Sequence, residues 1–178
     1  MERRRKLNRL QEYDYSNDGL YFVTSCVLDK TCCFGEIRSD EMHLNGYGKI
    51  ANQQWLWLEE QYPYVILHSF IIMPNHMHAI IEIDKHYNTE TKQIIVGTGR
   101  DLSLVVQAEP IKIKSISELM GAYKTTTSKQ IHLAGLSEFK WQRSFHDHII
   151  RDAKAFQTIT HYIENNPCKW PEDMFYQK

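Results

Sequence analysis

Two histidines near the middle of the chain have the type and spacing of metal ligands. His76 and His78 are separated by one residue in an apolar stretch with the pattern of a β-strand. Residues i and i+2 of a strand project from the same face, so both imidazoles can reach one divalent metal ion. The pattern is weak by itself, because the chain contains nine histidines. Chance and metal binding explain it equally well.

A tyrosine and an asparagine near the carboxyl end form a second candidate pair. Tyr162 and Asn166 are four residues apart in a segment with helical periodicity, so they share one helical face. An amide oxygen could approach a metal there while a phenol approaches the group that the metal activates. Core packing of the tyrosine explains the spacing as well. His146 and His148 repeat the H-x-H spacing and allow either a rival metal site or contact with a phosphate.

Composition indicates one globular domain that spans residues 1–178. With 42% hydrophobic and 24% charged residues, the chain can bury a core without disulfides. Its four cysteines lack the C-x-x-C spacing of a zinc site, so we expect reduced thiols in a cytoplasm. No apolar h-region follows the basic amino terminus, and no run of about eighteen apolar residues occurs. We therefore expect neither a signal peptide nor a membrane span.

The charge of the chain is nearly balanced. A formal net charge of −1 argues against coating of nucleic acid through bulk charge, but it allows a local basic groove. Scattered solvated cations are an equally good explanation of each basic residue. The candidates for contact with DNA are Arg3, Arg4, Arg5, Lys124, Arg143 and the imidazole of His148.

Hydrophobic periodicity predicts the strands and helices that position these residues. We expect strands at 20–28, 65–73 and 76–83, with the last two forming the centre of a sheet around a turn at Pro74-Asn75, and short strands near 34–37 and 42–48 with Asn45-Gly46 as the hairpin turn. The segment 141–150 is ambiguous, with a strand slightly preferred.

Three helices are expected as well. They span 50–61, 118–131 with Ser117 as N-cap, and 153–165 with Asp152 as N-cap, and the last ends before Pro167. Residues 84–113 lose clear periodicity and are expected to form a long excursion from the domain.

Several motifs occur in an order that is far more specific than any single one of them. They are Tyr21-Phe-Val-Thr, Phe34-Gly-Glu-Ile, Leu44-Asn with Gly48, Met73-Pro-Asn-His76-Met-His78, Tyr123-Lys124, Trp141-Gln-Arg143-Ser-Phe-His146-Asp-His148-Ile-Ile-Arg151 and Tyr162-Ile-Glu-Asn-Asn166-Pro167. Together they resemble the IS200-like transposases of the HUH single-tyrosine kind, and most of all the REP-associated tyrosine transposases. The resemblance covers nearly the whole chain, but residues 84–113 match none of its motifs.

The resemblance implies an α+β fold, with an antiparallel sheet of ferredoxin-like type flanked by helices and the tyrosine on a C-terminal helix. It implies that His76, His78 and Asn166 bind Mg²⁺ or Mn²⁺. It also implies that Tyr162 attacks single-stranded DNA near a hairpin, which gives a covalent 5′-phosphotyrosine and a free 3′-hydroxyl that can later rejoin strands.

Within that resemblance, the Trp-Gln-Arg and Asn-Asn-Pro motifs favour the domesticated branch over mobile elements. Mobile members of the family act as dimers and domesticated members are expected to be monomers, so we expect a monomer or a homodimer at the nucleoid in the cytoplasm. Two alternatives stay open. One is a catalytically inactive regulator that binds hairpin DNA, and the other is a metal-dependent nuclease that activates water and leaves Tyr162 merely packed.

Overall fold

The computed structural model describes residues 18–86 and 112–176. The candidate DNA contacts Arg3, Arg4 and Arg5 lie outside the described residues, as does most of the excursion expected at 84–113. In chain order the elements are β1 (Gly19–Cys26), the 3-10 turn η1 (Leu28–Lys30), β2 (Gly35–Arg38), β3 (Glu41–Leu44), α1 (Gly46–Gln61), β4 (Val65–Ile72), β5 (His76–Ile83), α2 (Ile116–Leu133), β6 (His146–Ile150), α3 (Ala153–Glu164) and the 3-10 helix η2 (Pro167–Glu172).

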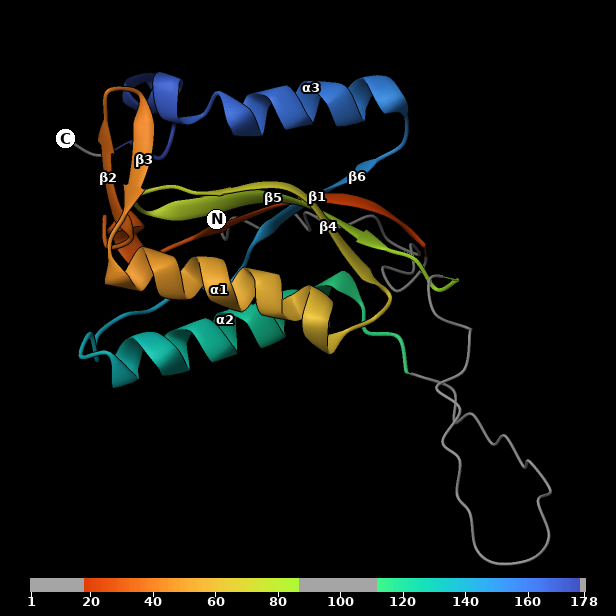
Figure 1. Ribbon diagram of the computed structural model, residues 1–178, viewed down its shortest axis with the longest axis horizontal. Coiled ribbons are helices and arrows are strands. Elements are labelled where there is room, and N and C mark those ends of the chain that lie inside the picture. Colours follow the sequence, from red (N-terminus) through yellow and green to blue (C-terminus); the bar gives the residue numbers. More distant parts are fainter. Residues whose placement is uncertain (1–17, 87–111, 177–178) are drawn as a thin grey trace, which may run out of the picture.

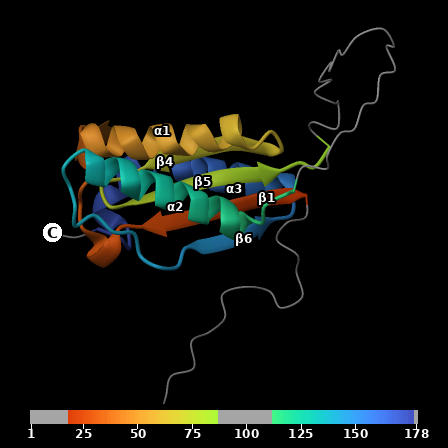
Figure 2. The ribbon, with the colours of Figure 1, turned by 90° about the horizontal axis from the view of Figure 1, so that it is seen from below.

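Four strands form the main sheet, in the order β4-β5-β1-β6, and every neighbouring pair is antiparallel. Helices α1 and α2 cover one face of this sheet, and α3 lies on the opposite face (Figure 1). Seen from below, α1 and α2 run side by side in front of the strands (Figure 2). This β-α-β-β-α-β arrangement confirms the predicted antiparallel, ferredoxin-like sheet flanked by helices.

The predicted hairpin of β4 and β5 is present, but its place in the sheet differs from the prediction. β4 lies at an edge, and the two central strands are β5 and β1. β5 pairs with β1 over its full length, from Gly19 opposite Ile83 to Cys26 opposite His76. The histidines therefore lie on a strand that has neighbours on both sides, which holds their backbone rigidly.

The hairpin turn predicted at Asn45-Gly46 is wrong. β2 and β3 are joined at Ser39 and Asp40, which both adopt positive φ angles of 50° and 62°. Asn45 is instead the N-cap of α1, since its side chain accepts a hydrogen bond from the amide of Gly48. Asparagine suits both roles because its short amide can replace a backbone acceptor. The helix consequently begins four residues before the predicted start.

The N-cap predicted at Ser117 is also wrong, because α2 begins two residues earlier. Ser115 accepts from the amide of Glu118, and the Glu118 carboxylate accepts from the amide of Ser115. This reciprocal capping box satisfies two amides that a cap at Ser117 would leave exposed. The N-cap predicted at Asp152 is confirmed, with its carboxylate accepting from the amide of Ala155.

The main core lies between the sheet and the α1–α2 layer. Alternate residues of β5 point into it, among them Met77, Ala79 and Ile81, which are all fully buried. Trp55 of α1 packs edge-on against Tyr123 of α2, with ring centroids 5.1 Å apart. A smaller cluster on the other face joins α3 to the sheet. None of the described helices has the length and apolar character that crossing a membrane requires.

Candidate metal and tyrosine site

His76 and His78 meet on the face of the sheet that α3 partly covers. Their side chains are 0% and 2% exposed, and the two Nε2 atoms lie 3.1 Å apart. The prediction that strand alternation places both imidazoles together is confirmed. Two ligands at about 2.1 Å from an octahedral ion lie about 3 Å apart at neighbouring vertices. The separation of the nitrogens therefore suits a shared divalent ion.

A buried asparagine fixes the tautomer of His76. The Asn75 amide nitrogen donates to the backbone carbonyls of Lys30 and Phe175, at 2.9 and 2.8 Å, which sets the orientation of the amide. The amide oxygen then faces His76 Nδ1 at 2.9 Å and accepts its hydrogen. Because the neutral ring carries one hydrogen, the lone pair is left on Nε2, the atom that faces His78.

His78 has a partner of the same kind. The Thr24 hydroxyl of β1, directly opposite in the sheet, lies 2.7 Å from His78 Nδ1 and can accept its hydrogen. The Phe22 ring stacks on the imidazole with centroids 5.4 Å apart. These contacts hold the ring plane, as outer contacts do for metal-binding histidines.

The electrostatic setting keeps both imidazoles neutral. Burial lowers the pKa of His76 and of His78 to about 3, and the charge of Lys30 adds to the effect at His76. A neutral imidazole offers the free lone pair that a metal needs, so neither proton competes with metal binding at neutral pH.

Helix α3 places Tyr162 over the histidine pair. Its apolar stripe, which includes Phe156, Ile159 and Ile163, packs on the sheet beside Ile80. The Tyr162 hydroxyl lies 3.1 Å from His78 Nε2, and the side chain is still 41% exposed. Burial raises the pKa of this phenol, and the charge of Asp173 raises it further. The side chain can therefore be reached by a large substrate, but its hydroxyl needs activation to act as a nucleophile.

Asp173 brings a carboxylate to the histidine pair, and Asn166 contacts that carboxylate. The Asn166 amide donates to the Asp173 carboxylate at 3.2 Å, and its own oxygen is buried without a hydrogen-bond partner. Ligand atoms of His76, His78 and Asp173 all lie within 4.8 Å of one another. A buried amide oxygen without a partner is costly unless something else binds it.

These residues fit a divalent ion. The site offers two imidazole nitrogens with free lone pairs, one carboxylate and one buried amide oxygen without a partner. Mixed nitrogen and oxygen donors of this kind suit Mn²⁺ well and Mg²⁺ acceptably. His76, His78 and Asp173 would hold the ion, and the Asn166 oxygen would complete the set.

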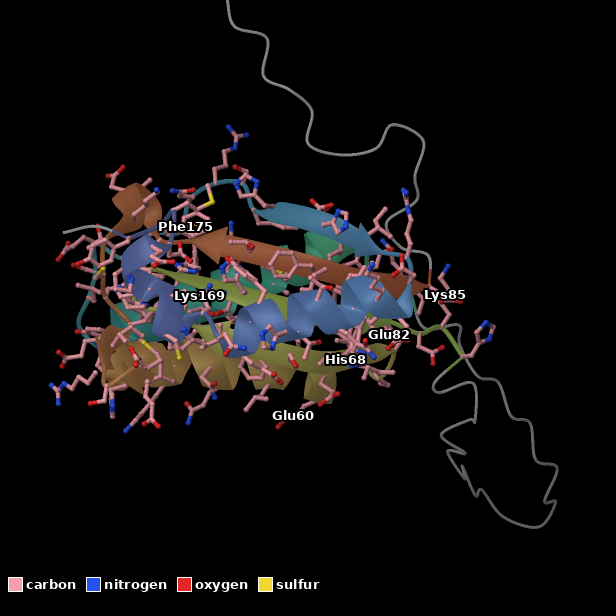
Figure 3. All side chains as sticks on the ribbon, turned by 90° about the horizontal axis from the view of Figure 1, so that it is seen from above. Glu60, His68, Glu82, Lys85, Lys169 and Phe175 are labelled. Carbon is pink, nitrogen blue, oxygen red and sulfur yellow. The ribbon has the colours of Figure 1, made fainter. Side chains whose placement is uncertain are left out.

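Asp173 is the site residue that the sequence analysis did not find. It follows Pro167 and the 3-10 helix η2, where no helical or strand periodicity points to a partner. The Phe175 ring packs against the His76 ring at a tilt of 41°, with centroids 4.5 Å apart, and brings this segment back to the site. In Figure 3, Phe175 lies beyond the C-terminal end of α3, and the hydrogen-bonded pair of His68 and Glu82 lies at the other end.

The structure does not bring the remaining predicted residues into the site. Lys124 lies on α2 and Arg143 on the loop before β6, and both line a groove at α2 instead. His148 lies opposite Phe22 in the sheet, on the same face as the histidine pair, but it is exposed. Within residues 18–86 and 112–176, the metal-ligand cluster includes neither His146 nor His148.

Comparisons with known proteins agree with this fold. No family model matches the chain. An uncharacterized protein of Haemophilus influenzae is 34% identical over 176 residues, which cover 97% of this chain and 93% of that protein. A second protein of that bacterium, provisionally named a REP-associated tyrosine transposase, is 23% identical over 92% of this chain and 84% of its own length.

One solved structure shows a similar fold. A REP-associated tyrosine transposase bound to a REP hairpin matches with a TM-score of 0.55 and 17% identity, over 90% of this chain and 74% of that one. A protein from Deinococcus radiodurans R1 that is provisionally named a transposase matches with a TM-score of 0.44 and 13% identity, over 88% of this chain and 95% of that one. The chain therefore belongs to one family with the uncharacterized protein of Haemophilus influenzae, and it resembles the REP-associated tyrosine transposases in sequence and in fold.

Proposed function

We propose that this protein cleaves and rejoins single-stranded DNA through a covalent bond between Tyr162 and a 5′-phosphate. The observation that carries the proposal is the position of the Tyr162 hydroxyl, 3.1 Å from His78 Nε2, which in turn lies 3.1 Å from His76 Nε2. A nucleophile and a pair of metal-binding nitrogens therefore face one point. Core packing alone would not leave the phenol 41% exposed beside buried histidines.

The proposed reaction needs no nucleotide cofactor. The Tyr162 hydroxyl gives up its proton and its oxygen forms a bond to phosphorus as the bond from phosphorus to the 3′-oxygen breaks. The 3′-oxygen takes up a proton and leaves as a 3′-hydroxyl, so one proton is released and one is consumed. The phosphodiester is exchanged for a phosphotyrosine of similar energy. Attack by a 3′-hydroxyl on the phosphotyrosine then reverses the step and rejoins the strands, so the balance of bonds closes in each direction.

The chain's own residues bind and position the reacting groups. His76, His78 and Asp173, with Asn166, would hold Mg²⁺ or Mn²⁺. Such an ion would offset the charge of Asp173, withdraw charge from the phosphate and favour the phenolate form of Tyr162. Asn75 and Thr24 keep the lone pairs of the imidazoles directed at the site. The contact of Phe22 with the edge of Tyr162 positions the phenol ring.

Hairpin-bearing single strands are the proposed substrate. The solved relative is bound to a REP hairpin, which supports the same class of DNA here. The histidines, Tyr162 and Asp173 all come from one chain. This complete set of residues supports a monomer as the working unit.

The test is capture of the covalent intermediate. Purified protein is incubated with end-labelled hairpin-bearing single strands and Mn²⁺ or Mg²⁺, and the products are separated on denaturing gels. We expect a protease-sensitive, metal-dependent adduct that Tyr162→Phe abolishes. Tyr176→Phe is the matched control, since Tyr176 is 37% exposed, close to the value for Tyr162, and contacts Trp170 rather than the histidines. This control should retain the adduct.

Two outcomes would contradict the proposal. Cleavage that survives in Tyr162→Phe would identify a nuclease that activates water. Tight binding without cleavage, across a library of hairpins and both metals, would identify an inactive DNA-binding regulator.

A further inference from the structure

A small pocket lies between the end of α3 and the segment that includes and follows η2. It has a volume of about 210 Å³, and its lining residues are Tyr162, Asn166, Lys169, Glu172, Asp173 and Met174. Pockets for whole drug-sized ligands have roughly 300–1,000 Å³. The size of this pocket therefore suits one group of a larger molecule, such as a single phosphate of a DNA strand, rather than a complete nucleotide.

Lys169 is the only cation among the described residues that line this pocket. Two carboxylates line it as well, those of Glu172 and Asp173. The charge of a divalent ion held by the histidines and Asp173 would be cancelled by these two carboxylates, which leaves no net charge to attract an anion. Lys169 adds one positive charge, equal in size to the single negative charge of a phosphodiester. With Lys169 the loaded pocket attracts a phosphodiester, and without it the pocket is neutral.

The Lys169 ammonium is available to a ligand. The side chain is exposed, and within residues 18–86 and 112–176 it forms neither an ion pair nor a hydrogen bond. Glu172 follows three residues later in η2, and residues with this spacing eclipse each other in a 3-10 helix. The two charged groups nevertheless do not pair. The positive charge of Lys169 is therefore not already neutralised by an acid of the pocket.

The backbone that carries Lys169 is held in place. The amide of Lys169 donates to the carbonyl of Asn166 at 3.1 Å, and the amide of Asp173 donates to the carbonyl of Trp170 at 3.1 Å. Trp170 is buried and packs against the His76 ring, with centroids 5.9 Å apart. Figure 3 shows Lys169 at the C-terminal end of α3. A fixed backbone keeps the ammonium near the pocket, which lowers the entropic cost of binding a group there.

Tyr162 joins this pocket to the histidine pair. Its hydroxyl lies 3.1 Å from His78 Nε2, and its side chain lines the pocket together with Lys169. A phosphodiester that is attacked by this hydroxyl has two non-bridging oxygens. Because the histidines are buried on the sheet and Lys169 is exposed on η2, the two oxygens can face different groups at the same time.

A solvated surface cation is the simpler explanation of an exposed lysine. Lys154 fits that explanation, since it is exposed at the start of α3 and does not line the pocket. It precedes Tyr162 by eight residues, which is about 12 Å along a helix axis. Lys169 differs because it shares one small pocket with the nucleophile and with the carboxylate that faces the histidines.

We propose that Lys169 binds a non-bridging oxygen of the phosphodiester that Tyr162 attacks. The ammonium stabilises the negative charge that the phosphate gains during attack, and it keeps its protons and forms no covalent bond. The phosphotyrosine carries the same single charge as the phosphodiester, so Lys169 stabilises the reaction in both directions. This inference rests on the proposed function and deepens it, because it names a catalytic residue besides the nucleophile and the metal ligands.

The test measures the rate of adduct formation separately from DNA binding. Full-length Lys169→Met, which keeps the length of the side chain but removes its charge, is compared with Lys169→Arg and the wild-type protein. Each protein is used at saturating concentration with an end-labelled hairpin-bearing strand and Mn²⁺, and the Kd for the same strand is measured in EDTA. We expect Lys169→Met to form the adduct about a hundredfold more slowly, with a Kd within about threefold of the wild-type value. Lys169→Arg should recover most of the rate.

Two control variants separate a contact from a general effect of charge. Lys154→Met removes one exposed cation from α3 and should form the adduct at the wild-type rate. Lys169→Met/Glu172→Gln restores the net charge of the pocket without restoring the contact, so it should remain slow. An equal loss in Lys154→Met or a full recovery in the double variant would overturn the inference. Lys169→Arg that is as slow as Lys169→Met would overturn it too, because the loss would then not be one of charge.

The same measurements distinguish this inference from the proposed function. If the wild-type protein formed the adduct and Lys169→Met formed it equally fast, only the inference would fail. If the wild-type protein formed no adduct, the proposed function would fail and the inference with it. Rejoining gives an independent check: the isolated adduct of Lys169→Met should react with a free 3′-hydroxyl more slowly by a similar factor, and an unchanged rate would overturn the inference.

Discussion

The two faces of the main sheet bury different kinds of side chain, apolar on one face and polar around the histidines on the other. On the α1–α2 side, Met77, Ala79 and Ile81 of β5 join a continuous apolar core. On the α3 side, His76 and His78 of the same strand are buried among an asparagine, a threonine and an aspartate. Along this one strand, residues that stabilise the core alternate with residues that form the candidate site. Buried polar groups are tolerated on the second face because nearly all of them have partners.

The largest expected effect is on the apolar face. Ile81→Ala removes a fully buried side chain from the core and leaves a cavity, so the free energy of unfolding should fall by about 3 kcal/mol. Urea denaturation followed by circular dichroism measures this change. Affinity of the folded protein for Mn²⁺ should not change, since Ile81 points away from the histidines.

Tyr162→Phe is the reciprocal control on the other face. It should change the free energy of unfolding by less than about 0.5 kcal/mol, because the ring stays and only an accessible hydroxyl is lost. A destabilisation equal to that of Ile81→Ala would mean that the two faces are not separate in function.

The next effect is on metal affinity. Asp173→Asn removes the carboxylate that faces both imidazoles, so the Kd for Mn²⁺ measured by isothermal titration calorimetry should rise at least about tenfold. The exposed neighbour Glu172 provides the control Glu172→Gln, which should bind Mn²⁺ normally. If both variants lost affinity equally, a general acidic surface rather than a built site would hold the metal.

A pH effect should distinguish the faces in the metal-free protein. The pKa of His76 and of His78 in the folded state is about 3, against an ordinary value of 6.5. The unfolded chain therefore binds more protons between these values, and the free energy of unfolding should fall as pH drops from 6.5 towards 3. Urea denaturation in EDTA at several pH values measures this slope.

Two variants test whether His76 and His78 cause this dependence of the free energy of unfolding on pH. His76→Gln should have a shallower dependence on pH over the same window, whereas His148→Gln, at an exposed position on β6, should keep the full dependence. Equal slopes in the wild-type protein and His76→Gln would show that the imidazole titrates normally.

The smallest effect concerns the outer contacts. Thr24→Val keeps the shape of the side chain but removes the hydroxyl that lies 2.7 Å from His78 Nδ1. The loss of one hydrogen bond, about 1 kcal/mol, should raise the Kd for Mn²⁺ about fivefold. Thr127→Val removes a buried hydroxyl from α2, on the apolar side, and should leave this Kd unchanged.

Residues with a local periodic signal could be placed from the sequence. The apolar alternation of 76–83 predicted β5 and the shared face of its histidines, and the periodicity of 153–165 predicted α3. The shared helical face predicted for Tyr162 and Asn166 is wrong, because α3 ends at Glu164 and Asn166 is the N-cap of η2. Errors occurred where two local motifs compete for one residue. Asn45 suits a turn and a helix cap equally, and only the packing of Gly48 against the Phe34 carbonyl decides between them.

The missing part of the site depends on long-range contacts. Asp173 reaches the histidines because Phe175 and Trp170 pack around the His76 ring, and no spacing in the sequence encodes such contacts. The groove at α2 is a similar case. Its cations come from α2 and from a loop whose position depends on the hydrogen bonds of Lys124.

The hydrogen bonds of Asn75 also have a consequence for the order in which the protein matures. A single side-chain amide connects Lys30, His76 and the backbone of Phe175. During synthesis β1, β4 and β5 with both histidines emerge before Tyr162, Asp173 and Phe175. A chain interrupted before Tyr162 therefore carries both histidines but lacks the phenol and the carboxylate of the site. If the proposed function holds, such a chain binds no phosphodiester in a position to be cut.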